Sequence, residues 1–228
     1  MQRRVEGRPW IGKAFSCDWT TAHAKIWRRV LAPWRSRRVR VLEVGTWEGR
    51  SAVYFLNYLY RCNITCVDTF GGSLSLLALP EHGAWVRQLP YVEIRFDRNV
   101  APFGDRVKKI KGRSVAVLDA LIAKRCSYDV IYLDASHRRD DVAADTARAW
   151  SLLREGGILI WDDYGWRPKY APSERPKDAI DAFLNAHNGS YVLLEKGYQV
   201  IIRRTLIKPA TAASPLPRSS DRGSSRAH

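Results

Sequence analysis

The sequence predicts an α/β fold in which a doubly wound, mostly parallel sheet ends in a C-terminal antiparallel hairpin. Short apolar segments alternate with helical patterns of about 10–15 residues, as in βαβ units. The short segments are apolar throughout, which is typical of parallel strands that are buried on both faces. The last two strand patterns, Tyr191–Glu195 and Tyr198–Arg204, flank Lys196-Gly197 and are expected to pair as a hairpin.

Apolar periodicity, together with residues that start or stop elements, predicts the order along the chain. A first amphipathic helix is expected at Thr20–Leu31, with a threonine cap and Pro33 beyond its end. The parallel strands are expected at Arg40–Val44, Asn63–Asp68, Val107–Ile110, Tyr128–Asp134 and Gly157–Asp162. Further helices are expected at Arg50–Tyr60, Tyr91–Val100, Val115–Ala123, Asp140–Leu153 (ended by Gly156-Gly157) and Pro176–His187.

Charge divides the 228-residue chain into three parts. The net charge of the whole chain is +15, but residues 41–207 contain 23 basic and 20 acidic residues, so the charges of this central part nearly cancel. Residues 1–37 are predicted to be a basic N-terminal helical extension, 38–206 the folded domain, and 207–228 a disordered basic tail with little apolar content. The longest apolar runs fall short of the ~20 residues that a membrane helix needs, so no membrane association is expected.

The sequence does not identify a binding partner for the basic N-terminal segment. Its four tryptophans and its charge could contact nucleic acid, but no nucleic-acid-binding motif accompanies them. We favour a solvated helix with tryptophans packed on the domain, and a homodimer contact there is a further option. The four cysteines lack C-x-x-C spacing and no secretory signal is visible, so a reduced, cytoplasmic protein is expected.

The segment VLEVGTWEGRS, residues 41–51, predicts a ligand loop after the first parallel strand. Gly45 and Gly49 let the backbone turn and a ligand approach, and Ser51 offers a cap and a hydroxyl. Glu43 needs a donor or cationic partner because it ends a buried strand. Asp68 ends the next strand, where a carboxylate can bind both hydroxyls of a ribose. Together they indicate an adenosine-type ligand with positive charge and no pyrophosphate.

Over residues 38–205 the chain resembles the class I S-adenosylmethionine (SAM)-dependent methyltransferases, which are Rossmann-like. The resemblance is carried by VLEVGTWEGRS, CVDTF, KKIKGRS, YDVIYLDASH, LLREGGILIWDDY and YVLLEKGYQVIIRR. The branch it resembles most is that of the small-molecule and sugar O-methyltransferases. It implies that Gly45, Thr46 and Gly49 line the methionine part of SAM, that Glu43 orients the loop, that Asp68 binds the ribose, and that Arg113-Ser114 lies by the adenine.

Carboxylates also follow the fourth and fifth parallel strands, at Asp134 and at Asp162-Asp163. Three carboxylates at one sheet edge repel one another unless they are protonated or bridged by a cation, and oxygen donors suit Mg²⁺. The arrangement resembles the metal-dependent O-methyltransferases, including catechol O-methyltransferase. By that resemblance Asp134, Asp162 and Asp163 would bind Mg²⁺ or another divalent cation, and His137 would be the general base beside Asp134.

The sequence therefore predicts a SAM-dependent methyltransferase that acts on a hydroxyl of a small molecule. One alternative is an RNA or protein methyltransferase whose basic N-terminal segment holds the acceptor. The chain lacks the N/D-P-P-Y motif of the amino-methylating DNA and RNA enzymes, because Asp134-Ala135-Ser136-His137 stands at that position. This absence argues against methylation of an exocyclic amine. A second alternative is a nucleotide-binding protein without catalysis.

Overall fold

The computed structural model describes residues 9–72, 83–166 and 171–205. In this part of the chain, seven strands form one sheet in the order β3-β2-β1-β4-β5-β7-β6. The first five pair in parallel, and β7 pairs antiparallel with both β5 and β6. This confirms the predicted fold class. The strands are β1 Arg38–Val44, β2 Arg61–Asp68, β3 Val107–Lys111, β4 Tyr128–Leu133, β5 Leu153–Trp161, β6 Tyr191–Lys196 and β7 Val200–Arg204.

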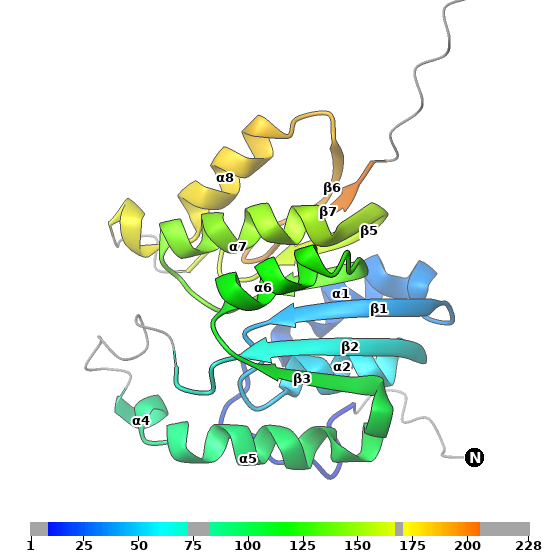
Figure 1. Ribbon diagram of the computed structural model, residues 1–228, viewed down its shortest axis with the longest axis vertical. Coiled ribbons are helices and arrows are strands. Elements are labelled where there is room, and N and C mark those ends of the chain that lie inside the picture. Colours follow the sequence, from blue (N-terminus) through cyan, green and yellow to red (C-terminus); the bar gives the residue numbers. More distant parts are fainter. Residues whose placement is uncertain (1–8, 73–82, 167–170, 206–228) are drawn as a thin grey trace, which may run out of the picture.

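Helices cover both faces of the sheet (Figure 1). One face is covered by α1, α2 and α5, and the other by α6, α7 and α8. The α-helices described are α1 Ala24–Leu31, α2 Arg50–Tyr58, α4 Gly83–Val86, α5 Leu89–Val100, α6 Ser114–Ala123, α7 Arg139–Leu152 and α8 Lys177–Ala186. Short 3₁₀ turns lie at Thr21–His23, Ala32–Trp34, Ala101–Arg106 and Pro172–Glu174.

Two apolar cores lie on opposite faces of the sheet. Along β1, Val41 belongs to the core beneath α1, α2 and α5, whereas its neighbour Leu42 belongs to the core beneath α6, α7 and α8. Successive strand residues point to opposite faces, so a strand that is apolar throughout can serve both cores. The apolar runs seen in the sequence are explained by this double burial.

The boundary between α7 and β5 differs from the prediction. The helix ends at Leu152 and β5 begins at Leu153, so Gly156-Gly157 lies inside the strand instead of ending the helix. Gly156 has a φ of +74°, and the pairing of β4 with β5 shifts register nearby. A Cβ on Gly157 would lie 2.8 Å from the carbonyl oxygen of Arg154. The two glycines therefore form a bulge in the strand.

The described part of the N-terminal extension, residues 9–37, packs on the domain. Trp27 on α1 is fully buried and donates a hydrogen bond from its indole nitrogen to Gln199 at 2.8 Å. The predicted threonine cap is wrong in detail. Asp18 Oδ1 accepts the backbone N–H groups of Thr20 and Thr21 instead, at 3.2 and 2.9 Å. The expectation that the tryptophans pack on the domain is confirmed for Trp27.

Two further expectations concern the membrane and the C-terminal tail. Among the described residues, no helix is long and apolar enough to cross a membrane. The predicted disordered tail, residues 207–228, lies outside the described residues, as does most of the connection between Phe70 and Leu89.

Candidate active site

The predicted ligand loop joins the ends of three strands. Gly45 has a φ of +85°, and its N–H donates to the carbonyl of Val67 at 2.8 Å. A Cβ on Gly45 would lie 2.0 Å from the carbonyl oxygen of Asp134, so a side chain would collide with backbone there. Gly49 also has a positive φ, +78°, but its missing Cβ faces the ring of Phe96 on α5 at 2.9 Å. Gly49 therefore allows helix packing in this structure, rather than ligand approach.

Glu43 lies beneath the loop and is fully buried. Its carboxyl accepts hydrogen bonds from the hydroxyls of Ser51 and Thr46, the latter at 2.6 Å, and lies 3.5 Å from the Cys66 sulfur. Burial raises the pKa of Glu43 to about 7, although these hydrogen bonds act to lower it. Ser51 is thus bound to Glu43 and does not cap α2, where Gly49 holds the capping position. The orienting role of Glu43 stays a prediction, which these contacts support.

Asp68 holds the loop from the end of β2. Its Oδ2 accepts the backbone N–H groups of Thr46 and Trp47, both at 2.8 Å, and its Oδ1 accepts that of Phe70 at 2.7 Å. A carboxylate has about four acceptor positions, so Oδ1 retains capacity for a further donor. Trp47 and Phe70 both have positive φ, 48° and 55°, which is strained for large side chains and is typical of functional loops.

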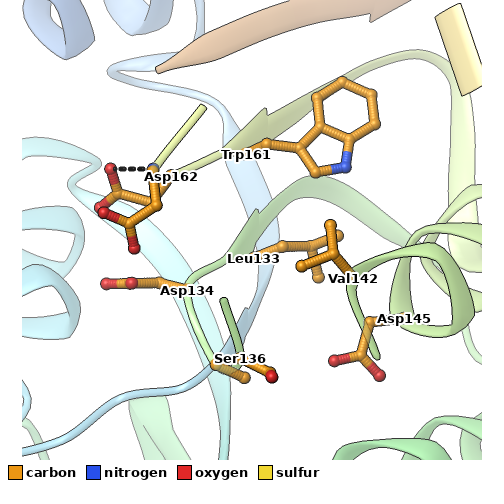
Figure 2. Close-up of a pocket in the computed structure, with 9 residues that line it drawn as sticks. Leu133, Asp134, Ser136, Val142, Asp145, Trp161 and Asp162 are labelled. Atoms are coloured by element: carbon orange, nitrogen blue, oxygen red, sulfur yellow. Dashed lines mark hydrogen bonds between the residues drawn. The ribbon is translucent and has the colours of Figure 1, made fainter. Parts of the chain in front are cut away.

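The β4 and β5 ends bring Asp134 and Asp162 together. The hydroxyl of the buried Tyr132 bonds to Oδ2 of Asp134 at 3.0 Å and to Oδ2 of Asp162. Figure 2 shows both carboxylates on the same side of the strand ends. Burial and then repulsion by Asp162 raise the pKa of Asp134 well above its ordinary value. Burial and then the charge of Asp163 raise the pKa of Asp162 to about 7.

His137 and Asp163 form a pair at the same edge. Nε2 of His137 lies 2.8 Å from Oδ2 of Asp163, and the hydroxyl of Tyr198 donates to Oδ1 of Asp163 at 2.7 Å. The His137 ring stacks on Trp166, with centroids 4.3 Å apart. Burial alone would raise the pKa of Asp163, but the hydrogen bond and charge of His137 leave it lowered. The imidazole is therefore fixed in place by a carboxylate and an aromatic ring.

Comparison with known proteins identifies the family of the chain. A family model described as a methyltransferase domain matches residues 42–164, which include the loop, Asp68, Asp134 and the β5 end. The chain belongs to this methyltransferase family. No curated protein matches the chain.

Solved structures share the fold of this methyltransferase at low sequence identity. An O-methyltransferase from Bacillus cereus, in complex with S-adenosylhomocysteine (SAH), is 18% identical over 84% of each chain, with a TM-score of 0.55. TomG from Streptomyces achromogenes, in complex with SAM, is 15% identical over 82% of each chain, with a TM-score of 0.57. MycE, from the mycinamycin biosynthetic pathway, is 18% identical with a TM-score of 0.57. The present chain spans 52% of MycE, about half of its length.

The three predicted metal ligands lie at one sheet edge of the methyltransferase domain. Their oxygens suit a hard divalent cation, and the repulsion that acts on Asp134 and Asp162 would be offset by one. In the described arrangement, however, Tyr132 lies between Asp134 and Asp162, and Asp163 is bound to His137. Within 9–72, 83–166 and 171–205, no group of three or more His, Cys, Asp or Glu side chains is gathered as metal ligands. Metal binding would require these hydrogen bonds to rearrange.

Residues from the N-terminal segment also reach this edge, which the sequence did not predict. Nε2 of His23 lies 3.9 Å from Oδ1 of Asp162, and the His23 ring stacks on Tyr198 with centroids 5.6 Å apart. Trp19 packs against Trp47 of the ligand loop at 5.8 Å. The sequence did contain a signal for Tyr132 and Tyr198, because each is a tyrosine close to the end of a predicted strand. None was visible for His23.

Proposed function

We propose that this protein transfers the methyl group of SAM to a hydroxyl group of a small molecule. The observation that carries the proposal is that the ligand loop and the His137–Asp163 pair lie at the same edge of the sheet. Gly45 on the loop abuts Asp134, three residues before His137, so a ligand held by the loop lies beside the imidazole. In open α/β sheets, ligands bind at this C-terminal edge of the strands.

The loop supplies the cofactor contacts in this proposal. Asp68 Oδ1, which already accepts the Phe70 N–H, would take a ribose hydroxyl, and the backbone around Gly45 and Thr46 would hold the methionine part of SAM. Glu43 keeps that backbone in place through Thr46 and Ser51 without touching the ligand itself. The sulfonium of SAM is already activated, so the protein mainly aligns the acceptor oxygen, the methyl carbon and the sulfur.

His137 is the proposed general base. The imidazole nitrogen that is not bound to Asp163 would accept the proton of the acceptor hydroxyl as the new oxygen–carbon bond forms and the carbon–sulfur bond breaks, which leaves SAH. Asp163 would stabilise the imidazolium that results. Tyr198 and Trp166 fix the two side chains, which reduces the reorganisation needed during the reaction. A divalent cation on Asp134, Asp162 and Asp163 would lower the pKa of the acceptor hydroxyl.

The basic N-terminal segment gives little support to an RNA or protein acceptor. Arg37, Arg38 and Arg40 are exposed, but they lie just before or in the first half of β1. Arg37 and Arg38 lie about 20 Å from the ligand loop and Arg40 about 15 Å from it, toward the opposite end of the strand. The part of the segment that reaches the site is instead Trp19 and His23. A polyanion bound by the arginines would therefore lie away from His137.

Transfer of labelled methyl groups tests the proposal. The full chain is incubated with SAM labelled in its methyl group, with a panel of hydroxylated small molecules in one arm and total RNA in the other. We expect label in alkali-stable methyl ethers of one small-molecule class and none in RNA. Label in RNA alone would favour the alternative acceptor, and an absence of label in both arms, despite cofactor binding, would favour a protein without catalysis.

A further inference from the structure

Positive charge gathers where β1, β2 and β3 begin, at the end of the sheet away from the ligand loop (Figure 1). Arg38 and Arg61 are partners in the parallel pairing of β1 with β2, and both are exposed. Paired positions on neighbouring strands lie about 4.8 Å apart, with their side chains on the same face. Like charges at paired positions repel each other. The start of the sheet therefore holds a repulsive pair whose repulsion a bound anion would relieve.

Arg38 and Arg61 share one face of the sheet with Arg40. The pair of residues that follows them, Val39 and Cys62, belongs to the core beneath α1, α2 and α5. Because successive strand residues point to opposite faces, Arg38 and Arg61 point away from that core. Arg40 comes two residues after Arg38 and points the same way. Three guanidinium groups therefore project from the first residues of two neighbouring strands.

Lys108, Lys124 and Arg125 extend this surface. Lys108 follows Val107, which packs on the core beneath α1, α2 and α5, so Lys108 points away from that core. Lys124 and Arg125 come directly after α6, which covers the same face as Lys108. Six exposed residues make up this surface, the basic face, and none of them is in an ion pair within the described part of the chain: Arg38, Arg40, Arg61, Lys108, Lys124 and Arg125.

The carboxylate beside the basic face does not neutralise it. Asp129 accepts the backbone N–H of Arg40 at 2.7 Å with Oδ2, and it accepts a guanidinium N–H of Arg154 at 2.9 Å with Oδ1. The guanidinium of Arg40 instead lies over the ring of Tyr128, 5.4 Å from the centroid. Unpaired nucleobases stack on guanidinium planes of this kind, and phosphates bind their N–H groups. The basic face therefore offers contacts to both parts of a nucleotide.

We propose that the basic face binds the phosphate backbone of a single-stranded nucleic acid, without presenting it for methylation. Arg38 lies about 20 Å from the ligand loop, so a strand held there is not placed against His137. An anionic membrane fits less well, because membrane-surface sites combine positive charge with exposed apolar side chains. The large apolar side chains that are exposed in the described residues all lie outside the basic face. This binding is independent of the proposed methyl transfer.

Fluorescence anisotropy of a labelled oligouridylate RNA of about 20 nucleotides, titrated with the full chain, tests the proposal. Each phosphate contact to a single strand adds about 0.7 to the slope of log affinity against log salt concentration. With about four to six contacts, wild type should lose affinity about 50- to 300-fold between about 50 and 200 mM salt. Arg38→Ala/Arg61→Ala should bind at least about 10-fold more weakly and reduce the slope by about 1.4, whereas its SAH affinity should be unchanged.

A matched control removes two exposed arginines from other parts of the surface. Arg98 lies on α5 and Arg139 at the start of α7, near the catalytic edge, and Arg98→Ala/Arg139→Ala should keep the wild-type affinity and slope. Thermal unfolding establishes that both double variants are folded when titrated. Equal losses in the two double variants would mean binding to the net charge alone and would overturn the proposal. Absence of RNA binding at about 50 mM salt would also overturn it, as would binding to phosphatidylserine vesicles without binding to RNA.

Discussion

The backbone of Gly45 lies directly against the carbonyl group of Asp134, so that a Cβ on Gly45 would be 2.0 Å from that oxygen. The two residues follow β1 and β4, and the N–H of Asp134 donates to the carbonyl of Val44 at 2.8 Å. The proposed cofactor loop and the proposed catalytic edge are therefore in contact through backbone atoms. Any side chain at Gly45 must disturb both.

Gly45→Ala tests this contact against a matched control. Gly189 has nearly the same φ, +84° against +85°, but a Cβ there would meet nothing within 4 Å. We expect Gly189→Ala to lower the unfolding free energy by about 1 kcal/mol, from the left-handed backbone alone. Gly45→Ala should cost at least about 3 kcal/mol because a collision with backbone is added. Urea unfolding measures both, and equal losses would contradict the contact.

Glu43→Gln tests the buried carboxyl beneath the loop. Because burial raises the pKa of Glu43 from 4.5 to about 7, its stabilising contribution is fully present below pH 4.5 and is lost as the pH rises through 7. We expect the unfolding free energy of wild type minus that of Glu43→Gln to fall by about 3 kcal/mol between pH 4.5 and 7.5. Denaturant unfolding across this pH range supplies the curve. A flat difference would show that Glu43 titrates normally.

His137→Gln tests the proposed base. Loss of a general base reduces turnover by about 10²- to 10⁴-fold, while SAH affinity should change less than about twofold because His137 is not assigned to the cofactor. Trp166→Leu removes the stacked ring without removing the base, and it should retain most of the turnover. Wild-type turnover in His137→Gln would exclude this histidine as the base.

Chelation tests the metal prediction. If Asp134, Asp162 and Asp163 bind a divalent cation, EDTA should stop methyl transfer and Mg²⁺ should restore it, because the cation would offset the repulsion among the three carboxylates. Mg²⁺ should also raise the melting temperature of wild type, but not that of Asp134→Asn. Turnover that is indifferent to chelation would leave the hydrogen-bonded arrangement, with Tyr132 between Asp134 and Asp162, as the working one.

The sequence was sufficient to predict the strands whose ends carry the candidate site. The central strands β1, β2, β4 and β5 each contain a buried, mainly apolar run, whereas the edge strand β3 is only partly buried. The strands β1, β2 and β4 end within one residue of the predicted positions. Residues that follow such strands share one edge of the sheet, so Asp68 and Asp134 could be placed there without a structure. The position of β5 was less accessible, since its glycines read as a helix end but form a bulge.

Long-range contacts could not be predicted in the same way. The bonds from Tyr132 to Asp134 and Asp162 depend on the alignment of β4 beside β5. His23 reaches Asp162 only because α1 packs across the sheet, a contact between residues 139 positions apart. The sequence also could not show that His137 pairs with Asp163, because a hydrogen bond between a histidine and a nearby carboxylate depends on loop conformation. Periodicity carries no information on such contacts.

The most direct test of the central claim is a calorimetric titration of the full chain with SAH, compared with Asp68→Ala. If Asp68 binds the cofactor ribose, wild type binds SAH with one site per chain, and Asp68→Ala binds at least about 10- to 100-fold more weakly. Asp97→Ala, which removes an exposed carboxylate paired with Lys109, should bind as wild type does. No binding of SAH by wild type, or an affinity unchanged by Asp68→Ala, would contradict the proposed cofactor site.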